Sequence, residues 1–283
     1  MKVGLVGCGN IGADICIGLE RNRIPADIVA LTDIDPSRAK VLIRSFQLGG
    51  VVCSLGENAA IVDLVVECAD AAVVEEVVEA CIEHHTDCLI LSVGALMANP
   101  DLFERAKKSG IKVHIPAGAL CGLDGIQAAM EAGLHYVELT TRKPPQGLAG
   151  APYLEENGID VEDLDEPLVV FEGSALEAVK AFPQSVNVAA SLSFAGIGPK
   201  ETRVRVIADP DATLNTHEVV AEGAFGRLRT VTENLPSPRN AKSSYLASLS
   251  ACACIRAAAE AFTPQTQAAR QPMMAANSMA SNS

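Results

Sequence analysis

The first residues that could do chemistry are three glycines near the start of the chain. Gly7, Gly9 and Gly12 are spaced as G-x-G-x-x-G, between the apolar run Val3–Val6 and a helical pattern over Ile11–Arg21. In that setting the first glycine allows a tight turn, the second lets a phosphate reach the backbone, and the third lets the helix pack on the strand. The N-terminus of the helix also favours an anion. We therefore predict a dinucleotide site at Gly7, Gly9, Asn10, Ile11 and Gly12.

A carboxylate follows at the spacing that such a site requires. Asp33 comes directly after a second apolar run, Ile28–Thr32, and lies 33 − 12 = 21 residues beyond the last glycine. An acid at this spacing accepts the ribose hydroxyls of the adenosine half. Because it repels a 2′-phosphate, we expect NAD to be preferred over NADP, although Arg38 is near enough in sequence to weaken that preference. The alternative is that Asp33 only caps the turn before Pro36.

Small residues extend the same predicted edge. Cys68 and Ala69 follow a fourth predicted strand, and Ser92 and Gly94 lie at the end of a fifth. Ligands of parallel sheets bind at the carboxyl ends of the strands, so these four residues are predicted to line the cofactor cleft. The alternative is that their small side chains only permit close packing.

The elements that would position these groups alternate between strand and helix over residues 1–119. Alternation at this pitch predicts an α/β fold, a Rossmann-type doubly wound parallel sheet that binds NAD. From residue 120 to 241 the pattern changes to a largely antiparallel sheet, which predicts a second, α+β domain for catalysis and dimerisation. Its strands are expected at 134–142, 168–173, 202–208, 218–225 and 227–233.

The end of the chain divides into a helix and a tail. A helix is predicted over Lys242–Phe262, where Leu246, Leu249 and Ala253 recur at helical spacing. We expect this helix to pack back on the first domain. Residues 263–283 are rich in Ala, Gln, Ser, Asn and Met without a clear period, so we expect a disordered tail.

Composition narrows the class of protein. Of 283 residues, 49% are hydrophobic and 20% are charged, which is typical of a globular chain. The net charge of −13, with Lys and Arg scattered, repels a polyanion and argues against a nucleic-acid partner. The nine cysteines form no C-x-x-C pair, which argues against a metal site. With no signal-type stretch and no apolar run long enough for a bilayer, we expect a cytoplasmic protein without membrane contact.

Short blocks in the second domain carry a family resemblance. They are Phe171-Glu172-Gly173-Ser174-Ala175, Phe182-Pro183 with Asn187-Val188-Ala189, Asn215-Thr216-His217-Glu218, and Ser244-Tyr245-Leu246. In this order, after the glycine motif, the chain resembles the L-aspartate dehydrogenase family up to about Ala261. The resemblance implies an NAD(P)-dependent homodimer that oxidises L-aspartate to iminoaspartate, or to oxaloacetate plus ammonia, for NAD biosynthesis, and runs the reverse reductive amination. It also implies His217 as the active-site residue, with Ala119 and Asn187 at the cofactor.

His217 suits that chemistry, because neutral imidazole could take the proton of the substrate amine or position water or ammonia. The alternative is a structural histidine, which is the commoner role of a single histidine. A dicarboxylate substrate also needs polar or cationic partners, and Arg142, Lys143 and Asn240 are the candidates. A guanidinium can hold a carboxylate through two hydrogen bonds. For Arg142 and Lys143 the alternative is a solvated strand end.

Two other functions fit the same layout. A homoserine dehydrogenase-like oxidoreductase shares the glycine motif and the antiparallel domain, but would use lysine and carboxylate chemistry in place of His217. A non-catalytic NAD(H)-sensing protein would bind NAD without turnover. Formation of NADH with aspartate, with homoserine or with neither substrate separates the three possibilities.

Overall fold

The computed structural model describes residues 1–183 and 187–262, with the side chains of all of these except Asn22 and residues 240–242. Its first part is a six-stranded sheet with the order β3-β2-β1-β4-β5-β6, in which every pair is parallel. This confirms the predicted doubly wound parallel sheet. The strands are β1 (Lys2–Val6), β2 (Asp27–Thr32), β3 (Val51–Val52), β4 (Leu64–Glu67), β5 (Asp87–Ile90) and β6 (Val113–His114).

Helices cover this sheet and bury it, as aliphatic parallel strands require. They are α1 (Asn10–Asn22), α2 (Pro36–Ser45), α3 (Leu55–Ile61), α4 (Val74–His84) after the 3-10 turn η1 (Ala71–Val73), α5 (Val93–Ala98) and α6 (Pro100–Lys108). The start of α2 shows how local sequence sets an element: Asp35 accepts a hydrogen bond from the N–H of Ser37 at 3.0 Å, and Pro36 opens the helix. The fifth strand ends at Ile90, earlier than expected, because Val93 already begins α5.

The second part is a five-stranded sheet with the order β11-β10-β7-β9-β8. Three of its pairs are antiparallel and only β7 with β9 is parallel, as a largely antiparallel sheet requires. Its strands are β7 (Leu134–Lys143), β8 (Leu168–Ser174), β9 (Arg203–Ala208), β10 (Asn215–Gly223) and β11 (Gly226–Asn234).

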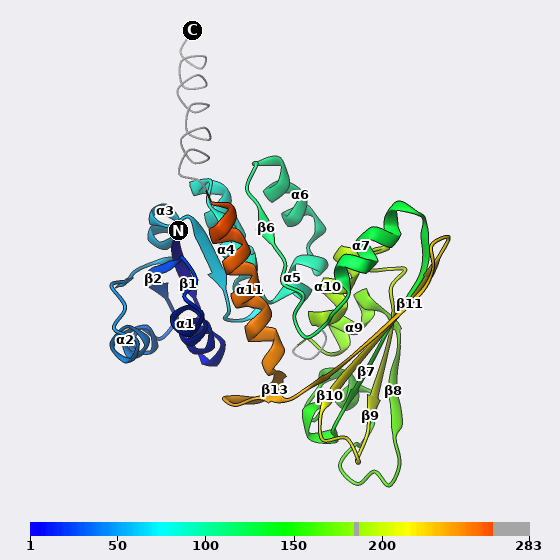
Figure 1. The fold of residues 1–283 in the computed structure, drawn as a ribbon. Helices are drawn as coiled ribbons and strands as arrows, with labels where there is room; N and C mark the ends of the chain where they lie inside the picture. Colours follow the sequence, from blue (N-terminus) through cyan, green and yellow to red (C-terminus); the bar gives the residue numbers. More distant parts are fainter. Residues whose placement is uncertain (184–186, 263–283) are drawn as a thin grey trace.

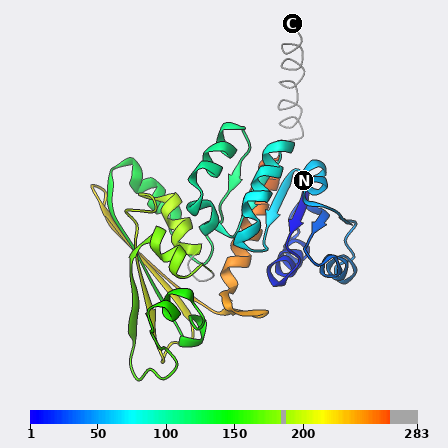
Figure 2. The same cartoon turned by 180° about the vertical axis from the view of Figure 1, so that it is seen from behind.

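Helices lie on only one face of this second sheet (Figure 1), and Figure 2 shows the same layers from behind. They are α7 (Leu123–Glu131), α9 (Ala175–Ala181) and α10 (Asn187–Ala195), and the short η2 (Pro145–Gly147) and α8 (Pro152–Glu156) precede β8. We call the helix-covered face the inner face and the opposite one the outer face. Val137, Leu139 and Val219 on the inner face join the helices in one hydrophobic core.

The chain then returns to the first sheet. A hairpin of β12 (Pro236–Ser237) and β13 (Asn240–Ser244) leads into α11 (Tyr245–Ala261), which packs against α1 (Figure 1). The helix begins three residues later than predicted because 240–244 pair as a strand. Its buried face is also different: Ala251, Cys252 and Ile255 are buried, whereas Leu249 is 39% exposed.

Close packing explains that face. A Cβ on Gly18 of α1 would collide with Cys252, so the two helices approach through small residues rather than leucines. None of the helices in the described part of the chain is long and apolar enough to span a membrane. The predicted tail, 263–283, lies outside the described residues.

Candidate active site

The glycine loop lies at the carboxyl end of β1, where the chain turns into α1. Gly7 has a φ of 99°, in the left-handed region that favours glycine. A Cβ on Gly7 would lie 2.7 Å from Cα of Ala69, and one on Gly12 would lie 2.7 Å from the carbonyl oxygen of Gly7. By contrast, a Cβ on Gly9 would meet no described atom within 4 Å. The fold itself requires Gly7 and Gly12, whereas Gly9 leaves space for an anion at the helix N-terminus.

Asp33 lies beside this loop. Its Oδ2 accepts a hydrogen bond from the N–H of Cys8 at 2.7 Å, and its Oδ1 accepts one from the N–H of Asp35 at 2.9 Å. A carboxylate offers about four lone-pair sites, so Asp33 can still accept ribose hydroxyls. The next side chain, Ile34, is fully exposed and leaves an apolar surface beside Asp33, a feature that the sequence analysis missed.

Glu67 connects the next two strand ends. It is completely buried, and its carboxylate accepts hydrogen bonds from the N–H groups of Ala69 and Ser92, both at 2.9 Å. The Ser92 hydroxyl donates a further bond at 3.0 Å. Burial raises the pKa of Glu67. The structure therefore brings Cys68, Ala69 and Ser92 to one edge, and the thiol of Cys68 donates to the carbonyl of Gly7 at 3.0 Å.

Two further predicted cofactor residues are Asn187 of the second domain and Ala119, at the boundary between the two domains. Asn187 Oδ1 accepts a hydrogen bond from the N–H of Gly94 at 3.1 Å, and both residues line a cavity of about 480 Å³. The carbonyl of Ala119 accepts bonds from Thr232 at 2.8 Å and from Asn234 at 3.2 Å. Both donors belong to β11. Their hydrogen bonds therefore hold Ala119, in the segment that joins the two domains, against the inner face of the second sheet.

His217 lies on the inner face of β10, opposite Thr141 of β7 in the strand register, and is only 3% exposed. Its Nδ1 is 3.1 Å from the hydroxyl of Thr141. Burial, and secondly the charge of Lys143, lower the pKa of His217 to about 3. The imidazole is therefore neutral at neutral pH.

Lys143 lies two residues beyond Thr141 and therefore on the same face. It is 4% exposed, and burial lowers its pKa to about 8. No side chain described in the structure forms an ion pair or hydrogen bond with its ammonium group. Among the described residues, Asn58 Oδ1 is the one side-chain N or O atom that is both fully enclosed and without a hydrogen-bond partner. Because Nζ of Lys143 also has no partner, it is not fully enclosed, and the ammonium keeps an opening to solvent.

Arg142 points the other way. Successive residues of a strand face opposite sides, so Arg142 lies on the outer face, where it pairs with Asp209 at 2.7 Å. Arg142, a candidate for substrate binding, is therefore on the opposite side of the sheet from His217. Asn240 begins β13, but its side chain lies outside the described residues.

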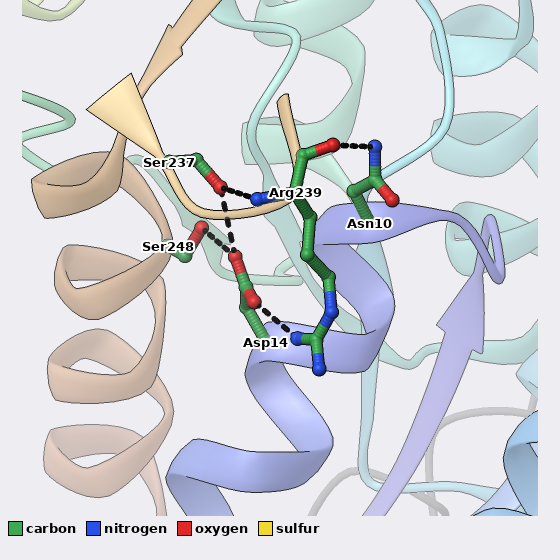
Figure 3. Close-up of polar contacts among 5 residues, drawn as sticks. All are labelled: Asn10, Asp14, Ser237, Arg239 and Ser248. Atoms are coloured by element: carbon green, nitrogen blue, oxygen red, sulfur yellow. Dashed lines mark hydrogen bonds and ion pairs between the residues drawn. The ribbon is translucent and has the colours of Figure 1, made fainter. Parts of the chain in front are cut away.

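A polar cluster that the sequence analysis missed joins α1 to the hairpin and to α11 (Figure 3). The buried Asp14 pairs with Arg239 at 2.6 Å and accepts a hydrogen bond from the hydroxyl of Ser248 at 2.9 Å. The amide of Asn10 donates to the carbonyl of Arg239 at 2.8 Å. At the other end of the hairpin, Ser244 accepts a hydrogen bond from Asn215 of β10 at 3.4 Å. The hairpin thus links the glycine loop to the strand that carries His217.

Known proteins resemble both halves of this arrangement. Residues 124–258 match the family model described as aspartate dehydrogenase, C-terminal, and residues 7–116 match homoserine dehydrogenase, NAD binding domain. The L-aspartate dehydrogenase of Methanosarcina mazei is 46% identical over 260 residues, which are 90% of this chain and 96% of that protein. The chain belongs to the L-aspartate dehydrogenase family. L-aspartate dehydrogenase 3 of Bordetella bronchiseptica is 40% identical over 259 residues, covering 90% and 94% of the two chains.

Solved structures agree with membership of the L-aspartate dehydrogenase family. The crystal structure of aspartate dehydrogenase from Thermotoga maritima superposes with a TM-score of 0.72 at 27% identity, covering 93% of this chain and 98% of that one. The apo scyllo-inositol dehydrogenase of Lactobacillus casei, at 13% identity and a TM-score of 0.54, shares the fold alone. The homoserine dehydrogenase match stops within the cofactor domain, whereas the domain that carries His217 matches the aspartate family.

Proposed function

We propose that this chain is an NAD(P)-dependent L-aspartate dehydrogenase. It oxidises L-aspartate to iminoaspartate, which gives oxaloacetate and ammonia on hydrolysis, catalyses the reverse reductive amination, and serves NAD biosynthesis. The observation that carries the proposal is the inner-face cluster of β7 and β10, where the neutral imidazole of His217 lies near the unpaired cation Lys143. This cluster lies in the domain that matches the aspartate family.

The cluster suits a small anionic amino acid. Lys143 has no carboxylate partner among the described residues, so its amine is available to the polar groups of a bound substrate. His217 is held by Thr141 at 3.1 Å and is neutral, so it can exchange hydrogen bonds with the substrate without repelling it. Both side chains are largely buried, and the low dielectric of such a setting strengthens each of these interactions.

The dinucleotide would bind across the glycine loop, with its pyrophosphate at Gly9 and the N-terminus of α1 and its ribose at Asp33. When bound there, the dinucleotide would supply the hydride acceptor of the reaction. Cys68, Ala69, Ser92, Gly94, Ala119 and Asn187 complete the cofactor residues of this proposal.

Asp33→Ala tests the cofactor part. We expect the Kd for NAD to rise about tenfold or more, because charge-assisted hydrogen bonds to the ribose are lost. Preference for NAD over NADP should fall at the same time, because the repulsion of the 2′-phosphate disappears. Displacement of bound NADH by NAD and by NADP, followed by the NADH fluorescence, measures both, and unchanged affinity would remove Asp33 from the site.

The reaction itself is tested by absorbance at the NADH band with NAD and L-aspartate, D-aspartate, L-glutamate, L-malate or L-homoserine. We expect NADH to form with L-aspartate alone. A signal with L-homoserine in its place would favour the homoserine-type reaction, and NAD binding without any turnover would favour a sensing protein.

A homodimer and a cytoplasmic location belong to the same proposal. All nine cysteines are free thiols, which suits a reducing compartment. On the outer face, Val169 and Val231 are 48% and 47% exposed, so a second copy could cover apolar surface there. Light scattering should give twice the chain mass, and a charge placed at Val231 should lower it.

A further inference from the structure

Lys143 and His217 are close neighbours on the inner face. Antiparallel pairing sets His217 opposite Thr141, and Lys143 lies two residues further along β7. Diagonal neighbours across two strands are within reach of long side chains. The charge of Lys143 also lowers the pKa of His217, so the two groups interact. A substrate that touches one of them can therefore touch both.

The direction of the hydrogen bond between Thr141 and Nδ1 of His217 goes together with the tautomer of the ring. The Thr141 hydroxyl has one proton, and Nδ1 of His217 is the acceptor that the described residues provide for it at 3.1 Å. If the hydroxyl donates to Nδ1, the ring proton is on Nε2. A neutral ring in this tautomer donates a hydrogen bond through Nε2–H and cannot accept a proton at that atom. In this tautomer His217 is a donor, and another group takes the substrate proton.

Lys143 is the candidate for that acceptor. No described carboxylate stabilises its charged form, and burial alone lowers its pKa to about 8. The titratable neighbours are few: His217 faces it from β10, and η2 contributes none. Asp209 lies on the outer face with Arg142. On β13, the side chain of Lys242 lies outside the described set. Nothing described therefore holds Lys143 permanently in its charged form.

We propose that Lys143 is the catalytic residue that accepts the ammonium proton of the substrate, while His217 orients the substrate through Nε2–H; this rests on the proposed function. An N–H bond of the ammonium breaks, its electron pair stays on the nitrogen, and a new N–H bond forms at Nζ of Lys143. The nitrogen lone pair then forms the C=N bond as the Cα–H bond breaks, and the hydride passes with both electrons to the nicotinamide of NAD, which the reaction consumes.

The pH dependence of kcat for aspartate oxidation tests this role, because kcat reports ionisations in the substrate complex. Lys143 must be neutral to accept a proton. In the wild-type enzyme, kcat should therefore rise about tenfold per pH unit and level off above about pH 8. A kcat that does not change between pH 6 and 9 would overturn the proposal without any variant.

Lys143→Arg keeps a positive charge but cannot become neutral. We expect kcat to fall about 10²–10⁴-fold and the pH limb to vanish, while the KM for aspartate stays within about threefold. In Lys143→Ala, added ethylamine should restore part of kcat, more so for amines whose pKa lies near the assay pH. Lys107→Met, on the exposed face of α6, removes a lysine charge far from the site and should keep the wild-type profile.

The outcomes separate this role from simple substrate binding. A Lys143→Arg enzyme with near-wild-type kcat and the wild-type limb would overturn the proposal, as would a change confined to KM. Titration with NADH shows that each variant is folded. If the wild-type enzyme forms NADH with none of the substrates, the proposed function itself fails, and this inference fails with it.

Discussion

The two faces of the five-stranded sheet treat charge in opposite ways. On the outer face, arginines are matched by carboxylates: Arg142 with Asp209 at 2.7 Å, Arg205 with Glu172 at 2.6 Å and Arg229 with Glu218 at 2.9 Å. On the inner face, Lys143 follows Arg142 directly in the sequence and has no carboxylate partner among the described residues. Two adjacent residues of β7 thus differ: Arg142 is paired and partly exposed, whereas Lys143 is buried and has no partner among the described residues.

That difference separates stability from function. Exposed ion pairs contribute little to folding, since water screens them and ordering two long side chains is unfavourable. A buried cation without a partner destabilises its charged form, which appears here as the lowered pKa of Lys143. Folding alone gives no reason to keep it there. On the inner face a ligand can therefore interact with the unpaired Lys143, whereas the arginines of the outer face already have carboxylate partners.

The largest effect expected on the inner face comes from His217→Ala. Turnover with aspartate should fall about 10²–10⁴-fold, because the group that contacts the reacting substrate is lost. NAD affinity should stay near wild-type, since the cofactor loop is on the other domain. Steady-state kinetics and NADH titration measure the two quantities. His135→Ala is the matched control, because His135 is exposed near the start of β7 in the same sheet. A His217→Ala enzyme with near-wild-type turnover would show that His217 takes no part in the reaction.

The second test compares the neighbours Lys143 and Arg142 directly. Lys143→Met should lower kcat/KM for aspartate about 100-fold or more, because the amine that takes the proton from the substrate disappears. Arg142→Met should change it by less than about threefold, because the guanidinium faces Asp209 on the outer face. Equal losses in the two variants would contradict the assignment of the faces.

Thr141→Val sharpens the comparison within the inner face. The change removes the hydroxyl that holds Nδ1 of His217 and leaves both ring tautomers accessible. A hydrogen bond of this kind contributes about 0.5–1.5 kcal/mol, so kcat should fall about two- to tenfold. Thr141→Ser keeps the hydroxyl and should restore most of the rate. A Val variant with unchanged kcat would show that the tautomer is set in another way.

The smallest effect is expected on the outer face. Arg205→Ala removes the ion pair with Glu172, and the free energy of unfolding should fall by less than about 1 kcal/mol. Aspartate kinetics should not change. Urea unfolding followed by circular dichroism measures the stability, and a loss of activity would mean that the outer face contributes to the site.

Local patterns in the sequence were enough to predict the fold class and several boundaries. Asp35 caps the start of α2 before Pro36, and Ser174 with Glu177 forms the capping box that begins α9, both from residues close together in the sequence. The alternation of strands and helices predicted the parallel sheet because each signal depends on neighbouring residues. The family resemblance was likewise predicted from short blocks and is confirmed by the relatives.

Contacts between distant residues were beyond such patterns. The inner position of Lys143 and the outer position of Arg142 follow from strand alternation, but choosing between them required knowing which face the helices cover. Asp14 and Arg239 are 225 residues apart in the sequence, so no local signal marks their pairing. The buried face of α11 was misassigned because packing against Gly18 selects small side chains, whereas a hydrophobic period selects leucines.

The return of α11 to the first domain has a consequence for the order in which the protein is made. Ile15 and Leu19 of α1 share a core with Ala251 and Ile255, near the end of the chain. At about 5–20 residues per second, the ribosome needs roughly 7–28 seconds to extend a chain from residue 119 to residue 261. Throughout that interval the N-terminal domain lacks one of its core helices. The half that is synthesised first is therefore completed last.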